Sequence, residues 1–302
     1  MTAAKMVRFG PAGQTDAFNA SGRRGAAEAV AWAADMGLDA WEMAFGRGVY
    51  LKPEVCGGVK SAAEERGVTL SAHAPYYVNL ANPDREKRLR SFRYLTDTAE
   101  ALLACGGEEI VVHAGSGMKQ ERSEALRLIR EGLRESLERL ADMGLSGARL
   151  CPETMGRPGQ IGGLDEILDL CLTDERLIPC VDFAHMHALT LGGMDSAEKF
   201  ERALDRAEEL LGKDRARGMH MHFSAIEYGT GGERRHRTFD ETGYWPDFRQ
   251  LMPLLARRGY RGILICECKG TQDIDAARMK RSYLEALAET PGKETQNGKK
   301  QP

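Results

Sequence analysis

Histidines and carboxylates occur in this sequence directly after short apolar runs. The stretch "GMHMHFS" holds two histidines two residues apart, and a third follows in "GERRHRTF". Imidazole nitrogens and carboxylate oxygens bind zinc, manganese and iron, and the same groups carry out general acid–base chemistry. The sequence has seven histidines in all: His73, His113, His185, His187, His220, His222 and His236.

Carboxylates follow three of the apolar runs. A carboxylate or imidazole at the end of a buried segment needs a hydrogen bond, an opposite charge or a cation. Lys269 is the one lysine at these run ends, so the acidic groups would repel one another unless a metal held them. We therefore predict a metal site with these four ligands: Glu153, Asp182, His220 and Glu267.

A single buried histidine is more often a hydrogen-bonded core residue than a metal ligand. We assign His187 and His222 to that class, although His222 would share a strand face with His220 and line the same opening.

The apolar runs indicate which elements position these side chains. Eight strand-like runs cover residues 5–10, 40–46, 68–74, 109–115, 148–154, 177–183, 217–223 and 262–268. Helical patterns lie between them, near 23–36, 84–104, 120–143, 162–173, 195–211, 246–258 and 272–288. Strands that alternate with helices predict parallel strands joined by crossovers, and eight such units predict a (β/α)8 barrel over residues 1–290. The alternative is an open doubly wound sheet, but no Gly-x-Gly-x-x-Gly turn follows the first run.

Catalytic groups of a (β/α)8 barrel gather where the strands end. His73 ends the third run, His113 the fourth and Glu153 the fifth. The sixth run ends at Asp182, with His185 three residues on, and the eighth ends at Glu267. The barrel would therefore bring these side chains to one mouth.

Bulk properties exclude several classes of protein. The 302 residues carry a formal net charge of -3, so there is no global basic field of the kind that binds nucleic acid by itself. No apolar run approaches the length of a membrane span and no signal segment is present at the start, which predicts a cytoplasmic protein with no membrane partner. Seven cysteines without a C-x-x-C pair predict reduced core thiols. The polar tail 291–302 is expected to be disordered, and a monomer is the default expectation.

The strand-end motifs resemble the endonuclease IV family of the xylose-isomerase-like barrels. The resemblance covers about residues 5–285 and is carried, in order, by "SAHAPYYVNL", "VVHAGS", "CPETMG", "CVDFAHMHA", "RGMHMHFS", "GERRHRTF" and "LICEC". It implies a zinc-dependent enzyme that cleaves damaged double-stranded DNA 5′ to an abasic site, with Glu153 as the catalytic, bridging residue. The resemblance implies ligands for three zinc ions. The first ion would be held by His73 and His113, and the second by Asp182, His220 and Glu267, with Glu153 shared by these two. The third would be held by His185 and His236.

One departure from the family pattern concerns the third zinc. The family's last motif is Asp-Arg-His, whereas this chain has Arg234, Arg235 and His236. An arginine does not ligate zinc. Glu233 stands one residue earlier and is the candidate replacement; without it the centre would hold two zinc ions instead of three.

Aromatic and basic residues near these motifs are candidates for DNA binding. Tyr76 and Tyr77 stand where the family inserts residues beside the damaged nucleotide, and their rings would fill the gap left by a missing base. The candidates for phosphate contacts are Arg234, Arg235 and Arg237, with Arg47 as a weaker one.

Two other functions stay open on the sequence alone. A sugar isomerase or epimerase on the same scaffold needs only Glu153, Asp182, His220 and Glu267 around one manganese or magnesium ion, which leaves the other histidines without a role. A non-catalytic DNA- or metal-binding relative is favoured by Arg234. Metal content separates the three functions. About three zinc ions per chain are expected for the nuclease, one manganese ion for the isomerase or epimerase, and no metal for the non-catalytic relative.

Overall fold

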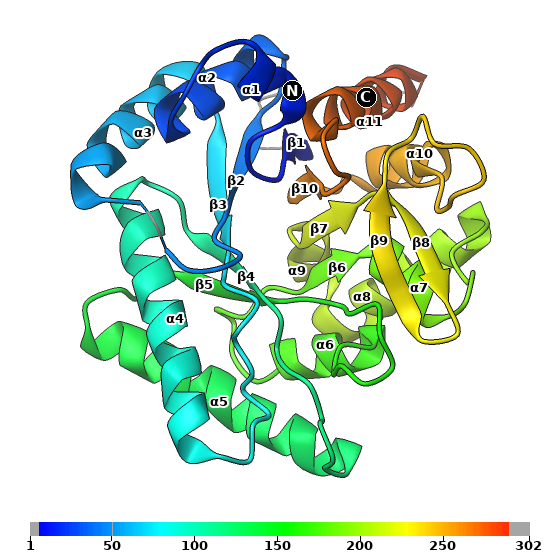
Figure 1. The fold of residues 1–302 in the computed structure, drawn as a ribbon. Helices are drawn as coiled ribbons and strands as arrows, with labels where there is room; N and C mark the ends of the chain where they lie inside the picture. Colours follow the sequence, from blue (N-terminus) through cyan, green and yellow to red (C-terminus); the bar gives the residue numbers. More distant parts are fainter. Residues whose placement is uncertain (1–5, 50, 290–302) are drawn as a thin grey trace, which may run out of the picture.

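Eight parallel strands close into a barrel in the computed structural model, which describes residues 6–49 and 51–289 (Figure 1). The barrel strands are β1 (Arg8–Pro11), β2 (Ala40–Ala44), β3 (Thr69–His73), β4 (Glu109–Val112), β5 (Arg149–Pro152), β6 (Cys180–Asp182), β7 (His220–Phe223) and β10 (Ile263–Cys266). They form two four-stranded sheets, β1-β10-β7-β6 and β2-β3-β4-β5. Parallel bridges from Ala12 to Glu42 and from Glu153 to Cys180 join the sheets and close the barrel.

Every apolar run of the sequence overlaps one of these strands, so the predicted (β/α)8 barrel is confirmed. The tail 291–302 lies outside the described residues. All seven cysteines are free and buried, as expected for core thiols. Among the described residues, no helix is both long and apolar enough to cross a membrane.

Helices cover the outside of the barrel (Figure 1). The predicted ones correspond to α2 (Ala26–Asp35), α4 (Arg85–Ala104), α5 (Arg122–Asp142), α6 (Leu164–Cys171), α8 (Ala197–Leu211), α10 (Phe248–Arg258) and α11 (Gln272–Glu289). In α5 the residues at three- and four-residue spacing, such as Ile129, Leu133 and Leu137, are buried against the barrel. Gly144 then adopts a positive φ of 76° just past the end of α5.

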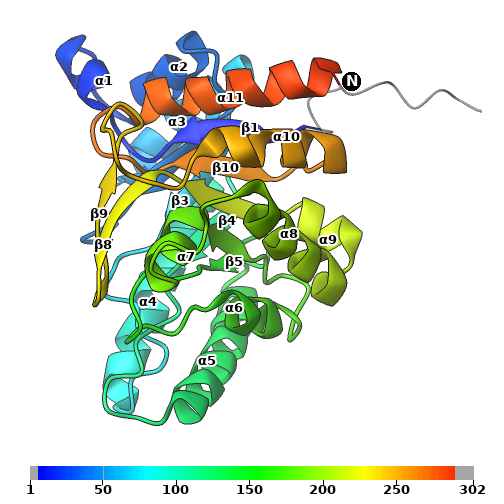
Figure 2. The ribbon, with the colours of Figure 1, turned by 90° about the vertical axis from the view of Figure 1, so that its right-hand side faces the viewer.

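Several elements were not predicted from the sequence. Helix α3 (Pro53–Arg66) buries only Cys56, Val59 and Ala63, and two central glycines lower its helix propensity. The other unpredicted helices are α1 (Asp16–Ala20), α7 (Phe183–Leu189) and α9 (Lys213–Arg217). An antiparallel hairpin of β8 (Ala225–Gly229) and β9 (Gly232–Arg237) follows β7. Figure 2 shows this hairpin at the end of the barrel where β1 ends.

Candidate metal centre

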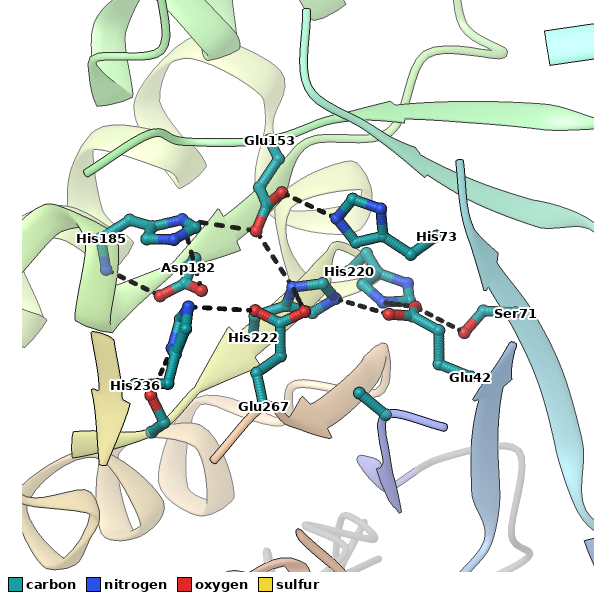
Figure 3. A network of polar contacts seen from close by, with 12 residues as sticks. Glu42, Ser71, His73, Glu153, Asp182, His185, His220, His222, His236 and Glu267 are labelled. Atoms are coloured by element: carbon teal, nitrogen blue, oxygen red, sulfur yellow. Dashed lines mark hydrogen bonds and ion pairs between the residues drawn. The ribbon is translucent and has the colours of Figure 1, made fainter. Parts of the chain in front are cut away.

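The ends of the barrel strands bring the predicted site residues together. His73 is the last residue of β3 and Asp182 the last of β6, while His113, Glu153 and Glu267 directly follow β4, β5 and β10. Because the strands are parallel, these positions meet at one mouth. Figure 3 shows the imidazoles and carboxylates pointing toward one another there.

Glu153 stands at the middle of the cluster. Its Oε2 lies 3.3 Å from Nε2 of His73 and 3.0 Å from Nε2 of His113. Its Oε1 lies 3.1 Å from Nδ1 of His222 and 3.5 Å from Nδ1 of His185. Each carboxylate oxygen therefore faces a different pair of histidines, although the side chain is fully buried.

The first ligand group is His73, His113 and Glu153, whose ligand atoms all lie within 4.8 Å of one another. Nδ1 of His73 lies 2.8 Å from the carbonyl oxygen of Ala74, so Nδ1 carries the proton that this contact needs. Nε2 of His73 faces Glu153, and a metal bound between them would take the place of the proton on Nε2, which is the orientation that a metal ligand requires.

The second ligand group differs from the sequence prediction in its histidine. The prediction chose His220, but it is Nδ1 of His222 that lies 3.1 Å from Glu153 and 3.3 Å from Glu267. His220 lies deeper, with Nδ1 2.9 Å from Glu109 and Nε2 3.2 Å from Glu42. Both histidines point into the barrel because they are two residues apart on β7, and only the later one reaches the level of the mouth.

Asp182, predicted for this second group, pairs in register with His222 and also belongs to the third group. Its Oδ1 accepts a hydrogen bond from the backbone N–H of His185, at 2.8 Å, which caps helix α7. Its Oδ2 is buried and has no hydrogen-bond partner among the described residues. Nδ1 of His185 lies 3.4 Å from this oxygen, but it is closer to the carbonyl oxygen of Thr154, at 2.9 Å. A buried carboxylate oxygen without a hydrogen bond is costly, and a cation beside it would reduce that cost.

The third group contains Asp182, His185 and His236, again within 4.8 Å of one another. Nδ1 of His236 lies 2.7 Å from Oγ of Ser224. Oε2 of Glu233 lies 3.5 Å from Nε2 of His185, and the Glu233 side chain is only 16% exposed. Arg234, by contrast, has a 64% exposed side chain and lies near Glu227 of β8.

A β-bulge explains why Glu233 faces inward at this position. Glu227 pairs with Arg235, whereas the next residue, Tyr228, pairs with Glu233, so Arg234 is the extra residue of β9. An extra residue reverses the alternation of side chains along a strand. Glu233 thereby comes to the same side as His236, and its backbone N–H donates to Gly156 O at 2.9 Å.

Ionic interactions compensate the buried carboxylates. Burial raises the pKa of Glu153, but hydrogen bonds from His113, His185 and His222 hold it well below its usual value. Burial lowers the pKa of His73, yet the hydrogen bond and charge of Glu153 raise it to about 9. In Glu267 the nearby His222 outweighs burial and lowers the pKa to about 2. These carboxylates are ionised at neutral pH and attract any cation that reaches them.

The cluster opens into a cleft of about 590 Å³ whose lining includes His73, His113, His185, His236 and Glu267. The ligand groups described above consist of nitrogen and oxygen donors, which suit zinc or manganese. Oδ2 of Asp182, which accepts no hydrogen bond from the described residues, and the convergence of carboxylates on imidazoles indicate that these side chains fit a metal.

The candidate DNA-binding residues are distributed unevenly around the cleft. Tyr76 is 62% exposed, lines the cleft and stacks on His113 with ring centres 5.8 Å apart. Tyr77 is also exposed, but its ring lies against Tyr94. Arg47 lies in the loop after β2 and is exposed.

The three arginines of β9 also differ from one another. Arg234 and Arg235 are 64% and 57% exposed and lie 3.7 and 3.9 Å from Glu227. Arg237 is only 15% exposed, because it pairs with Glu227 and Glu241 and stacks on Tyr244. The prediction that Arg237 contacts phosphate is therefore not supported by its position, whereas Arg234 and Arg235 are accessible.

Sequence reasoning missed two residues of this region. His222 was assigned to the core, and Glu42 of β2 was not considered. Glu42 is fully buried and lies 3.2 Å from both His222 and His220. The one available signal was the charged residue inside an otherwise apolar run, "AWEMAFG".

Comparisons with known proteins agree with this architecture. A family model described as a xylose isomerase-like TIM barrel matches residues 30–289. An uncharacterized protein of Methanocaldococcus jannaschii is 34% identical over 250 residues, which cover 83% of this chain and 89% of that protein. A probable endonuclease 4 of Acholeplasma laidlawii is 29% identical over 190 residues, which cover 60% of this chain and 63% of that relative.

Two solved structures are similar over nearly the whole chain. Endonuclease IV from Thermus thermophilus has a TM-score of 0.68 and 25% identity, with 94% of this chain and 100% of that chain covered. A D-tagatose 3-epimerase-like protein has a TM-score of 0.70 and 19% identity, with 94% and 99% covered, and this likeness shows the fold alone. The chain belongs to the xylose isomerase-like TIM barrel family, with endonuclease IV among its relatives in both sequence and structure.

Proposed function

We propose that this protein is a zinc-dependent phosphodiesterase that cleaves DNA 5′ to abasic sites. The observation that carries the proposal is the position of Glu153. One of its oxygens faces His73 and His113 while the other faces His222 and His185. A carboxylate in that position can bridge two metal ions, as a multinuclear hydrolase requires.

The further histidines favour this function over sugar epimerisation. An epimerase with one metal needs Glu153, Asp182, His222 and Glu267, which this site also contains. It has no evident use for His73 and His113 on one side of that group. His185 and His236 on the other side would be equally unused, and they support a third ion together with Glu233.

Zinc ions bound here would polarise the phosphodiester and lower the pKa of a coordinated water, so that a nucleophile forms near neutral pH. The residues of the chain hold and orient this chemistry. Glu153 spaces the ligand groups, and Ala74 O fixes the ring of His73.

Residues on the rim of the cleft favour a DNA substrate. The exposed ring of Tyr76 is placed beside His113, where it can occupy the space of a missing base. Arg234 and Arg235 supply local positive charge on a protein whose net charge is -3. Damaged double-stranded DNA is therefore the proposed partner.

The test is cleavage of a duplex that carries one abasic analogue, with and without a chelator, beside a matched intact duplex. We expect a single cut on the 5′ side of the lesion, loss of the activity with chelator and recovery with zinc. A protein that holds one manganese per chain and epimerises a ketose, but leaves the abasic duplex intact, would establish the epimerase instead. A protein that binds the duplex without cutting it would establish the non-catalytic relative.

A further inference from the structure

His222 stands between two sets of carboxylates. Its Nδ1 lies 3.1 Å from Glu153 and 3.3 Å from Glu267, on the side of the cleft. Its Nε2 lies 3.2 Å from Oε1 of Glu42, on the inner side of the barrel (Figure 3). A neutral imidazole has one N–H and one lone pair, so His222 can bind a metal through Nδ1 only if the proton is on Nε2.

Glu42 is held in place to receive that proton. It pairs in register with Ser71 on the neighbouring strand, and Oγ of Ser71 donates to Oε2 of Glu42 at 2.8 Å. Both side chains are fully buried. Oε1 of Glu42 and Nε2 of His222 are both buried and have no hydrogen-bond partner among the described residues. They lie 3.2 Å apart, so a small rotation of either side chain would let each satisfy the other.

We propose that Glu42 is a positioning residue that fixes the tautomer and ring orientation of the metal ligand His222. The inference rests on the proposed function, because it requires a metal on the cleft side of His222. A carboxylate that accepts the second N–H of a ligating histidine makes the imidazole a stronger donor and restricts its rotation. Removing such a partner typically lowers metal affinity by about 10- to 100-fold.

The buried chain continues behind Glu42. Nε2 of His220 lies 3.2 Å from Oε2 of Glu42, and Nδ1 of His220 lies 2.9 Å from Glu109. Glu109 lines a cavity of about 460 Å³ that opens near the start of β4, away from the metal-binding mouth. A histidine between two carboxylates compensates their buried charge, so Glu42 can remain a charged acceptor for His222.

Glu109 provides a matched control for Glu42. Both are buried glutamates that lie beside a histidine of β7. Glu42 faces both His222 and His220, whereas Glu109 lies 2.9 Å from His220, the deeper of the two histidines. Glu42→Gln and Glu109→Gln remove the same charge. The two variants separate an effect on His222 from a general effect of changing a buried glutamate.

The experiment measures zinc affinity by competition with a chelator, zinc stoichiometry at saturation, and the visible spectrum of the cobalt-substituted protein. We expect Glu42→Gln to lose about tenfold or more in affinity, with unchanged stoichiometry and a shifted cobalt spectrum. Glu109→Gln should stay within about threefold of the wild-type affinity, below the range for direct partners of a ligand. Circular dichroism and a cooperative melt establish that each variant is folded.

If Glu42→Gln fails to fold, Ser71→Ala carries the test, because it removes only the hydroxyl that orients Glu42 and should weaken zinc binding measurably. Wild-type zinc affinity in folded Glu42→Gln overturns the inference but not the proposed metal centre. If Ser71→Ala is used in its place, wild-type affinity in that variant has the same meaning.

An equal loss of affinity in Glu109→Gln also overturns the inference. A lower stoichiometry in Glu42→Gln would make Glu42 a direct ligand and replace the positioning role. A wild-type protein that takes up no zinc would overturn the proposed function, and this inference with it.

Discussion

Glu233→Ala is expected to empty the third metal site without affecting the other two. Glu233 is the carboxylate that faces His185, with 3.5 Å between Oε2 and Nε2, and its replacement leaves His185 and His236 with only the shared Asp182. Loss of a direct ligand should cost at least the upper end of the range for indirect partners, about 100-fold in affinity. At about 1.4 kcal/mol for each factor of ten, this is roughly 2.8 kcal/mol. The variant should therefore hold about one zinc fewer per chain.

The assay is zinc content by elemental analysis after gel filtration with a weak chelator, together with cleavage of the abasic duplex. Arg234→Ala is the matched control, because Arg234 is the next residue of β9 but has a 64% exposed side chain. The control should keep its zinc. A Glu233→Ala protein with the same zinc content and rate as the wild type would refute the reasoning and make Glu233 an ordinary rim carboxylate.

Three further outcomes are expected. Glu153→Gln should abolish cleavage while circular dichroism shows an intact fold, because the bridging carboxylate between the histidine pairs is lost; wild-type cleavage by the folded variant would remove the two-metal mechanism. Tyr76→Ala should reduce the preference for abasic over intact duplex in binding assays more than it slows hydrolysis, and an equal loss on both duplexes would make Tyr76 an ordinary rim residue. His222→Asn should lose a zinc ion, whereas His220→Asn should keep the wild-type zinc stoichiometry but melt at lower temperature, since breaking a buried ion pair costs about 3–5 kcal/mol; a zinc loss confined to His220→Asn would restore the sequence-based assignment.

Most of the fold could be predicted from the sequence because parallel barrel strands are short and apolar. The run "EIVVHAG" predicts both the strand β4 and the position of His113 at its end. The same reasoning placed His73, Glu153 and Glu267, since the end of a strand also determines which mouth its side chain reaches. Helix α3 was missed because its buried residues are few and two glycines interrupt its pattern.

The choice between His220 and His222 depends on depth along the barrel axis, which the sequence does not contain. Alternation along a strand determines which face a side chain takes, and the two histidines share a face. Which of them reaches the mouth follows from the stagger of β7 against its neighbours. In the structure, His222 pairs with Asp182 of β6 while His220 pairs with Cys180.

The bulge at Arg234 could not be predicted from the sequence either, because it depends on how β8 and β9 pair. Read as a regular strand, the sequence places Arg234 on the side of His236 and Glu233 on the opposite side. One extra residue reverses this, so the arginine in the family's aspartate position faces solvent and the preceding glutamate faces His185. The substitution is therefore compatible with a third metal site, because the bulge places a different carboxylate beside His185 instead of leaving the position without one.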